Sequence, residues 1–178
     1  QSRRLSAWVF ELLSTDSRKA AASSNAIVQL GTNAFPLLVR ELSAKDGLWE
    51  RLAGSKGGYG TLFPSPALRK IRACAAVKAL GTNGRALGPY VTNLMVHPTP
   101  AVRLAAFQAA AAISVPDAKS LLTNAVASDP SFSIRGVAMK HLLQMGDDPG
   151  EVCDLLVTNL WNRRSSAGTL KGIAEEVN

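Results

Sequence analysis

Leu30-Gly31-Thr32-Asn33 recurs letter for letter as Leu80-Gly81-Thr82-Asn83, 50 residues further along the chain. In each copy we interpret the leucine as the last buried residue of a helix. The glycine is then expected to turn in a left-handed conformation, which glycine adopts without a Cβ penalty. The Thr-Asn pair suits the turn or the cap of a second helix. Two copies of one helix end therefore predict a chain built from repeated helix pairs.

Two further markers keep the phase of this repeat. An Ile-Arg or Val-Arg pair recurs at spacings of 31 and 32 residues, and a Thr-Asn pair follows it after 20, 20 and 23 residues. The first marker stands at Ile71-Arg72, Val102-Arg103 and Ile134-Arg135, and the second at Thr92-Asn93, Thr123-Asn124 and Thr158-Asn159. Because two independent markers stay in register over three units, chance is a poor explanation.

A polar residue followed by proline opens each of these units, at Ser65-Pro66, Thr99-Pro100 and Asp129-Pro130. The polar side chain can accept hydrogen bonds from the free N–H groups of a first helical turn. Proline lacks the N–H that would be unpaired at the next position. Each pair is therefore expected to begin a helix.

Apolar residues in the second helix of every unit follow the i, i+3, i+4, i+7, i+8 spacing of one helical face. The predicted buried positions are Phe35, Leu38, Val39 and Leu42; Leu87, Tyr90, Val91, Leu94 and Met95; Ala118, Leu121, Leu122, Ala125 and Val126; and Cys153, Leu156, Val157, Leu160 and Trp161. The Thr-Asn pairs fall on the opposite face. In the first helices, residues 71, 74 and 75 and their counterparts share one face.

These patterns predict an all-α fold, an α-solenoid of about four helix pairs with flanking capping helices, in one domain. The 47% hydrophobic and 6% aromatic content favours close-packed helices. The units are expected at about 18–42, 65–97, 99–127 and 129–162, with an insert at 43–64, an N-terminal capping segment at 5–13 and a closing helix at 165–177. Insertions in a solenoid map to loops on one face, which is often the binding face.

The first-helix signature resembles HEAT repeats of the short bacterial type. It reads Ile71-Arg72, then Ala76, then Leu80-Gly81, and the resemblance covers residues 18–162. Leu5-Ser6-Ala7-Trp8, followed by AIVQLGTNAFPLLVREL, is similar to a group of uncharacterised bacterial HEAT-repeat proteins in which such a segment follows a signal or membrane anchor. This resemblance implies an exported or membrane-anchored scaffold; otherwise the protein is expected to be cytoplasmic.

Two departures from the repeat pattern stand out. Ala22 occupies the position at which the later units have arginine, and Ala112-Ile113-Ser114 stands where Leu-Gly is expected. The second departure weakens only the turn chemistry of that unit.

No residue set predicts catalysis or metal binding. The two histidines, His97 and His141, are not at ligand spacing and are interpreted as edge or solvent-facing residues. The loop 54–60 is glycine-rich, but no strand precedes it and no Gly-Lys-Ser/Thr follows, so a phosphate loop is disfavoured. Cys74 and Cys153 are each expected to fill a small buried site. The chain is therefore predicted to be no enzyme and to need no cofactor.

An acidic cluster comprises Asp147, Asp148, Glu151 and Asp154. Paired carboxylates can act as an acid/base site. Acids near a helix N-terminus also complement the helix dipole, and this is the simpler interpretation.

Positive charge is concentrated in the middle of the chain. The net charge is +7, and the acid-free window between Glu50 and Asp117 carries +8. The candidate anion-binding residues are Arg51, Lys56, Arg69, Lys70, Arg72 and Arg85. Such a window either binds a phosphate backbone or is a plain solvated face.

Two functions follow from these patterns. The first is a non-catalytic scaffold for an unknown protein or peptide, which binds through the concave or insert-bearing face. The candidate partner-binding residues are Arg40, Thr92, Asn93, Thr123, Asn124, Thr158 and Asn159, with Trp49 and Tyr59 of the insert. Trp49 and Tyr59 equally suit folding the insert onto the solenoid.

The alternative is nucleic-acid binding through the basic region 51–116, either as a simple backbone binder or in the manner of the helical-repeat DNA glycosylases. Such an enzyme needs an acid and aromatic residues in its cleft, and only Asp154 with Trp161 comes near. The longest apolar run, about 104–115, is too short to span a bilayer. The protein is expected to be a monomer.

Overall fold

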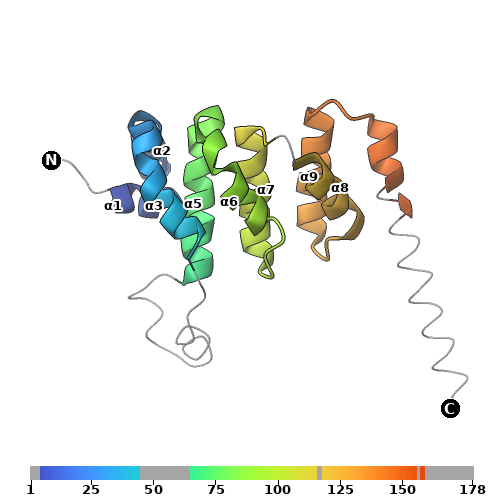
Figure 1. The fold of residues 1–178 in the computed structure, drawn as a ribbon, viewed down its shortest axis with the longest axis horizontal. Coiled ribbons are helices and arrows are strands. Elements are labelled where there is room, and N and C mark those ends of the chain that lie inside the picture. The colour runs from blue at the N-terminus through green and yellow to red at the C-terminus, as the bar shows by residue number, and fades with distance from the viewer. Residues whose placement is uncertain (1–4, 45–64, 116–117, 156, 159–178) are drawn as a thin grey trace, which may run out of the picture. The chain divides into compact units, whose positions relative to one another are not determined.

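A computed structural model describes residues 5–44, 65–115, 118–155 and 157–158, and these residues form helices and turns without a strand (Figure 1). The α-helices are α1 Leu5–Glu11, α2 Ser17–Leu30, α3 Phe35–Leu42, α5 Pro66–Leu80, α6 Gly88–Leu94, α7 Pro100–Ile113, α8 Ala118–Ser128 and α9 Phe132–Gln144. Two 3-10 helices, η1 Gly31–Ala34 and η2 Gly81–Leu87, link α2 to α3 and α5 to α6. The prediction of an all-α, solenoid-like fold is confirmed.

Two compact units divide the chain, Gln1–Ala118 and Lys119–Asn178. The division falls inside the predicted third helix pair, and the single-domain organisation stays a prediction. The insert beyond Ala44 and the closing helix at 165–177 lie outside the described residues, whereas the predicted capping segment contains α1.

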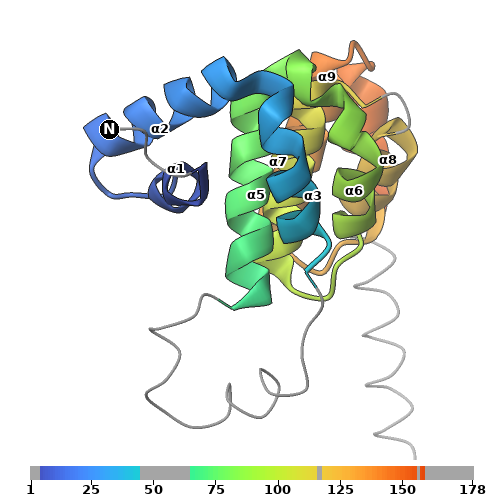
Figure 2. The ribbon, with the colours of Figure 1, turned by 60° about the vertical axis from the view of Figure 1, so that its left-hand side comes forward.

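The first unit has two layers of helices. The helices α2, α5 and α7 follow one another in one layer, while α3 packs on α5 and α6 packs on α7 in the other (Figure 2). The most extensive contact is between α5 and α7. The core between the layers includes the fully buried side chains of Leu38, Val77, Val91 and Phe107.

In the second unit, helices α8 and α9 are followed by helical residues 149–155. Its buried apolar side chains include Leu122, Val126, Ile134 and Leu142. Lys119 near the start of α8 forms an ion pair with Asp147.

The predicted helix starts are correct in two of three cases. Ser65 caps α5 by accepting a hydrogen bond from the N–H of Leu68 at 3.2 Å, and α7 begins at Pro100. The third prediction is wrong, because α9 begins at Phe132 and not after Asp129. The Asp129 carboxylate accepts a hydrogen bond from the N–H of Ser131 at 2.8 Å, which holds a turn before the helix.

The Leu-Gly-Thr-Asn stretches end α2 and α5 as predicted. Gly31 and Gly81 have φ angles of +52° and +54°, a region that favours glycine. In the third unit, Ser114 takes the same role with φ 52° and ψ 60°. The ψ angles differ, because those of Gly31 and Gly81 are −128° and −140°. A residue with positive φ thus ends the first helix even where the sequence offers no glycine.

In α3, Leu38 and Leu42 are buried as predicted, whereas Phe35 and Val39 are half-buried. The predicted buried faces hold for most of α6 and for α8 except the half-buried Leu121, with two corrections. Tyr90 is 39% exposed, on the rim of α6. In the last helical segment, Val152 is buried whereas Cys153 and Val157 are exposed. The carboxylate of Asp148 accepts hydrogen bonds from the N–H groups of residues 150 and 151, which fixes the start of this helix and turns Val152 inward. Leu156, Leu160 and Trp161 lie outside the described residues.

Candidate protein-binding surfaces

In the Thr-Asn pairs predicted to bind a partner, the threonine and the asparagine side chains have different surroundings. The hydroxyl of Thr92 donates to the carbonyl groups of Gly88 at 3.2 Å and Pro89 at 3.0 Å. The hydroxyl of Thr123 donates in the same way to Lys119, at 3.0 Å. These threonines thus bond to their own helices, while the neighbouring Asn93 and Asn124 are exposed. Thr158 is also exposed.

Five of the predicted site residues lie outside the described residues: Trp49, Arg51, Lys56, Tyr59 and Asn159. Their roles stay predictions.

Arg40 and Arg69 converge on one carboxylate. The Nε and Nη2 atoms of Arg69 donate to Glu41 at 2.6 and 3.1 Å, and Nη2 of Arg40 lies 3.2 Å from the same carboxylate. The hydrogen bonds from Arg69 hold the pKa of Glu41 below its usual value. Sequence reasoning missed this cluster because Glu41 lies outside the acid-free window and on another helix.

Lys70 is a buried residue, with only 6% of its surface exposed. Its amino nitrogen lies 3.1 Å from Nε2 of His97, whose Nδ1 accepts a hydrogen bond from the N–H of Thr99 at 3.1 Å. The lysine predicted to bind an anion therefore contributes to the interior of the first unit.

The repeated arginines hold the turn before their own helix. Nη1 of Arg103 donates to the carbonyl groups of His97 at 2.8 Å and Pro98 at 3.0 Å. Nη1 of Arg135 donates to the carbonyl of Asp129 at 3.1 Å, again six residues earlier. This geometry gives the Ile/Val-Arg marker of the sequence a structural role.

Arg72 differs from these two arginines. Its guanidinium carbon lies 4.0 Å from the ring centre of Phe10 on α1, a cation–π contact, and burial lowers the pKa of the guanidinium. Arg85 is exposed, and its Nε donates to the carbonyl of Ile113 at 3.5 Å.

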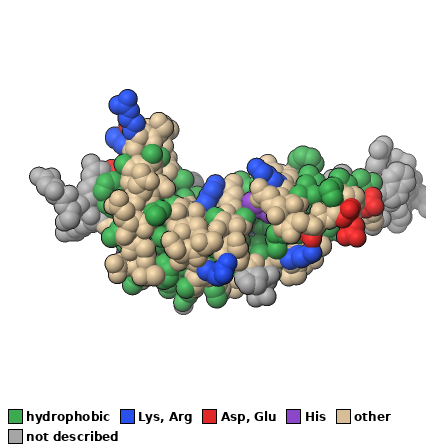
Figure 3. All heavy atoms as spheres, turned by 90° about the horizontal axis from the view of Figure 1, so that it is seen from above, with side chains coloured by type: hydrophobic (Ala, Val, Ile, Leu, Met, Phe, Trp, Pro, Cys, Tyr) green, Lys and Arg blue, Asp and Glu red, His purple; other side chains and the backbone are tan. Residues whose placement is uncertain are grey.

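The described cations of the predicted anion site thus already have contacts within the protein. On the face shown in Figure 3, Lys and Arg side chains form separate small patches between hydrophobic and uncharged side chains. A continuous basic surface is not visible on this face.

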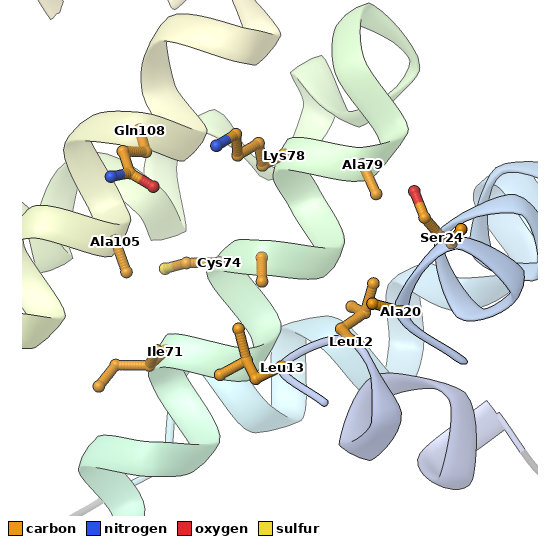
Figure 4. A pocket seen from close by; sticks show the side chains of 12 residues that line it. Leu12, Leu13, Ala20, Ser24, Ile71, Cys74, Lys78, Ala79, Ala105 and Gln108 are labelled. Carbon is orange, nitrogen blue, oxygen red and sulfur yellow. The ribbon is translucent and has the colours of Figure 1, made fainter. Parts of the chain in front are cut away.

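A half-open groove of about 490 Å³ lies in the first unit, along α5 between α7 and the α1–α2 hairpin (Figure 4). Its lining consists of small and apolar side chains with three polar ones, and comprises Leu12, Leu13, Ala20, Ala21, Ser24, Ile71, Cys74, Ala75, Lys78, Ala79, Ala105 and Gln108. The sequence placed Ile71, Cys74 and Ala75 on one face but did not indicate that a groove runs over it. The signal that could have located it is the run of alanines on α2 and α5.

The lining of this groove offers no general base beside its Ser24, Cys74 and Lys78 side chains. It contains no histidine or carboxylate. Burial raises the pKa of the Cys74 thiol to about 12, so that the sulfur stays protonated at neutral pH. Over the described part of the chain, no group of three His, Cys, Asp or Glu side chains could hold a metal ion. No described helix is long and apolar enough to cross a bilayer.

Comparisons with known proteins agree with the helical repeats. No curated protein and no solved structure matches the chain. Residues 65–143, which run from the cap of α5 almost to the end of α9, match the family model described as HEAT repeats, and this match supports a HEAT-repeat protein.

Proposed function

We propose that the protein is a non-catalytic scaffold that binds another protein or a peptide. The observation that carries this proposal is the apolar groove along α5, whose lining residue Leu13 is 47% exposed. Contiguous exposed apolar surface on a soluble fold marks an interaction site more often than a site of chemistry. The exposed Asn93 and Asn124 are separate candidates for polar contacts, each within its own unit.

Nucleic-acid binding receives less support from the described residues. Arg69 and Arg40 share the carboxylate of Glu41, and Lys70 is buried. Backbone binding requires several cations that can release counterions from phosphates. We therefore expect no salt-dependent binding when the protein is titrated with a DNA duplex. An affinity for the duplex that falls steeply as the salt concentration rises would favour nucleic-acid binding instead.

Site-specific photo-crosslinking tests the scaffold function. A photoreactive amino acid replaces Leu13 at the groove, and the matched control carries it at Val28, which lies on α2 outside the groove lining and is 43% exposed. In cells that contain the native partners, we expect protein adducts from position 13 and few from position 28. The adducts from position 13 should disappear when Ala75→Leu fills the groove floor. Equal adduct formation at both positions, or none at position 13, would contradict a binding role for the groove.

A further inference from the structure

The groove along α5 has a floor suited to a helix. Five of its lining residues, Ile71, Cys74, Ala75, Lys78 and Ala79, lie on α5. Their spacing of i, i+3, i+4, i+7 and i+8 forms one face over two helical turns, about 10–12 Å at 1.5 Å per residue. Cys74 is fully buried in this face, Ile71, Ala75 and Ala79 are half-buried and Lys78 is exposed. This face of α5 therefore forms a partly open track parallel to the helix axis.

Small side chains bring an occupant close to the backbone. The alanines at 75 and 79 on α5, at 105 on α7, and at 20 and 21 on α2 border the track. Helices pack at separations of about 8–10 Å that depend on the side chains at the contact, and alanine permits the shorter ones. The groove therefore accommodates a regular element whose own large side chains fill the space.

The groove volume agrees with one face of a helix. A helix about 10 Å across and two turns long has a volume of roughly 850 Å³. A groove of about 490 Å³ therefore takes the inward-facing part and leaves the other part in solvent. A small-molecule site would instead enclose most of its ligand behind several convergent polar groups.

Charge distinguishes the two ends of the groove. Leu13 and Ile71 lie at one end and Lys78 and Gln108 at the other (Figure 4). Lys78 is exposed and forms no ion pair with any described residue, and the lining contains no acid. A carboxylate on the occupant would complement this uncompensated ammonium group.

We propose that the groove binds an amphipathic helix of a partner protein that carries a carboxylate about two turns from the first of its apolar anchors. The proposal rests on the scaffold function and specifies the partner. The apolar anchors, at i and i+3 or i+4, lie against Leu13, Ile71 and the alanine floor. The Asp or Glu, near i+7 of the partner helix, faces Lys78. Because the contact covers only one helix face, we expect a dissociation constant on the order of 10–100 μM.

A pair of synthetic peptides tests the proposal on the full chain. Each is about 15 residues long, a length at which isolated helices begin to form. One has leucines at i and i+4 with glutamate at i+7, and the other has lysine in place of that glutamate. Fluorescence anisotropy should show the glutamate peptide binding about tenfold more tightly. In Lys78→Glu this preference should reverse, whereas Lys140→Glu, an exposed position of α9, should leave it unchanged.

Filling the groove provides a second readout that does not depend on charge. Ala75→Leu should weaken glutamate-peptide binding by more than tenfold while the circular dichroism spectrum stays native. Ala101→Leu, at an exposed position of α7 outside the groove, is the control.

Equal or absent binding of both peptides would overturn the proposed occupant. A dimer that Ala75→Leu dissociates, measured by light scattering, would assign the groove to a second copy and overturn it as well. If the peptides fail but crosslinking from position 13 still depends on Ala75, only the partner class is wrong. If both fail, the scaffold function of the groove fails too.

Discussion

The helix α5 and the N-terminal hairpin of α1 and α2 are buried to very different extents. In α5 the buried residues include Ala73, Cys74, Ala76 and Val77. In α2 only Ser23 and Ile27 are buried, and in α1 only Val9. The reason is the packing around each helix: α5 packs against α2, α3 and α7, whereas α2 packs against α5 and the short α1.

This difference shows how one repeat design yields both a core and a binding surface. Modules of a stacked array contact only their neighbours, so an inner module is covered on two sides. The α1–α2 hairpin retains large exposed side chains at Phe10, Leu13 and Val28. The groove lies where the well-packed helix α5 meets this loosely packed hairpin.

The largest expected effect comes from the inner core. Phe107 on α7 is 2% exposed, and Phe107→Ala should lower the free energy of unfolding by about 3–5 kcal/mol through lost burial and a residual cavity. Urea unfolding followed by circular dichroism measures this loss. A cost below about 1 kcal/mol would mean that α7 is not part of a packed core.

A matched valine pair makes the contrast between the inner module and the hairpin quantitative. Val77 on α5 is fully buried and Val9 on α1 is 6% exposed. Each Val→Ala change removes the same two methyl groups, worth about 1.6 kcal/mol of transfer free energy. We expect Val77→Ala to cost about 2–3 kcal/mol and Val9→Ala about 1–2 kcal/mol, because the hairpin can close up around the smaller side chain. Equal costs would contradict the difference in packing.

The glycine turns at Gly31 and Gly81 allow the cost of backbone strain to be measured separately from the cost of poor packing. Gly31 and Gly81 have nearly the same φ, and a Cβ at either position would meet no atom within 4 Å. Replacement by alanine should therefore cost about 1–3 kcal/mol at both, from backbone strain alone. Thermal unfolding of Gly31→Ala and Gly81→Ala measures the two costs. A much larger cost at Gly81 would show that the inner turn also bears packing strain.

The ion pair between α3 and α5 predicts a pH dependence. Arg69 keeps the pKa of Glu41 below the ordinary value of 4.5, so the carboxylate stabilises the fold above that pH. The contribution is lost as the pH falls through the lowered pKa. Because a third of the Arg69 side chain is exposed, we expect Glu41→Gln to cost only about 1 kcal/mol at pH 7. The difference from the unchanged protein should shrink between pH 5 and pH 3 in urea unfolding; a constant difference would exclude this ion pair as its cause.

Most of the fold could be predicted because short sequence motifs mark where the repeated helices begin and end. The glycines after Leu30 and Leu80 and the Ser65-Pro66 cap act within a single turn. The error near Val152 concerns which face of the last helical segment turns inward, since Val152 is buried and Cys153 is exposed. Periodicity says which side chains share a face, and contacts with other elements decide which face is buried.

The candidate site could be predicted much less well, because it depends on contacts between helices. The sequence indicated free cations at Arg69 and Lys70, but Glu41 meets Arg69 from α3 and His97 meets Lys70 from the turn between α6 and α7. The Ile71 and Ala75 face was correctly assigned to one side of its helix. What the spacing could not show is that the neighbouring helices leave this face half-buried at a groove.

Ser114 gives the smallest effect and tests the end of an inner helix. It is the one described non-glycine residue with positive φ, and a left-handed conformation costs an L-residue about 1–2 kcal/mol. Part of the gain on changing to glycine is offset by the greater freedom of glycine in the unfolded chain. Ser114→Gly should therefore raise the free energy of unfolding by about 0.5–1 kcal/mol, measured by urea unfolding. Ser43→Gly is the matched control, because Ser43 ends α3 at φ −88° and gains no relief. Destabilisation by Ser114→Gly would mean that the serine, and not the left-handed turn alone, holds the end of α7.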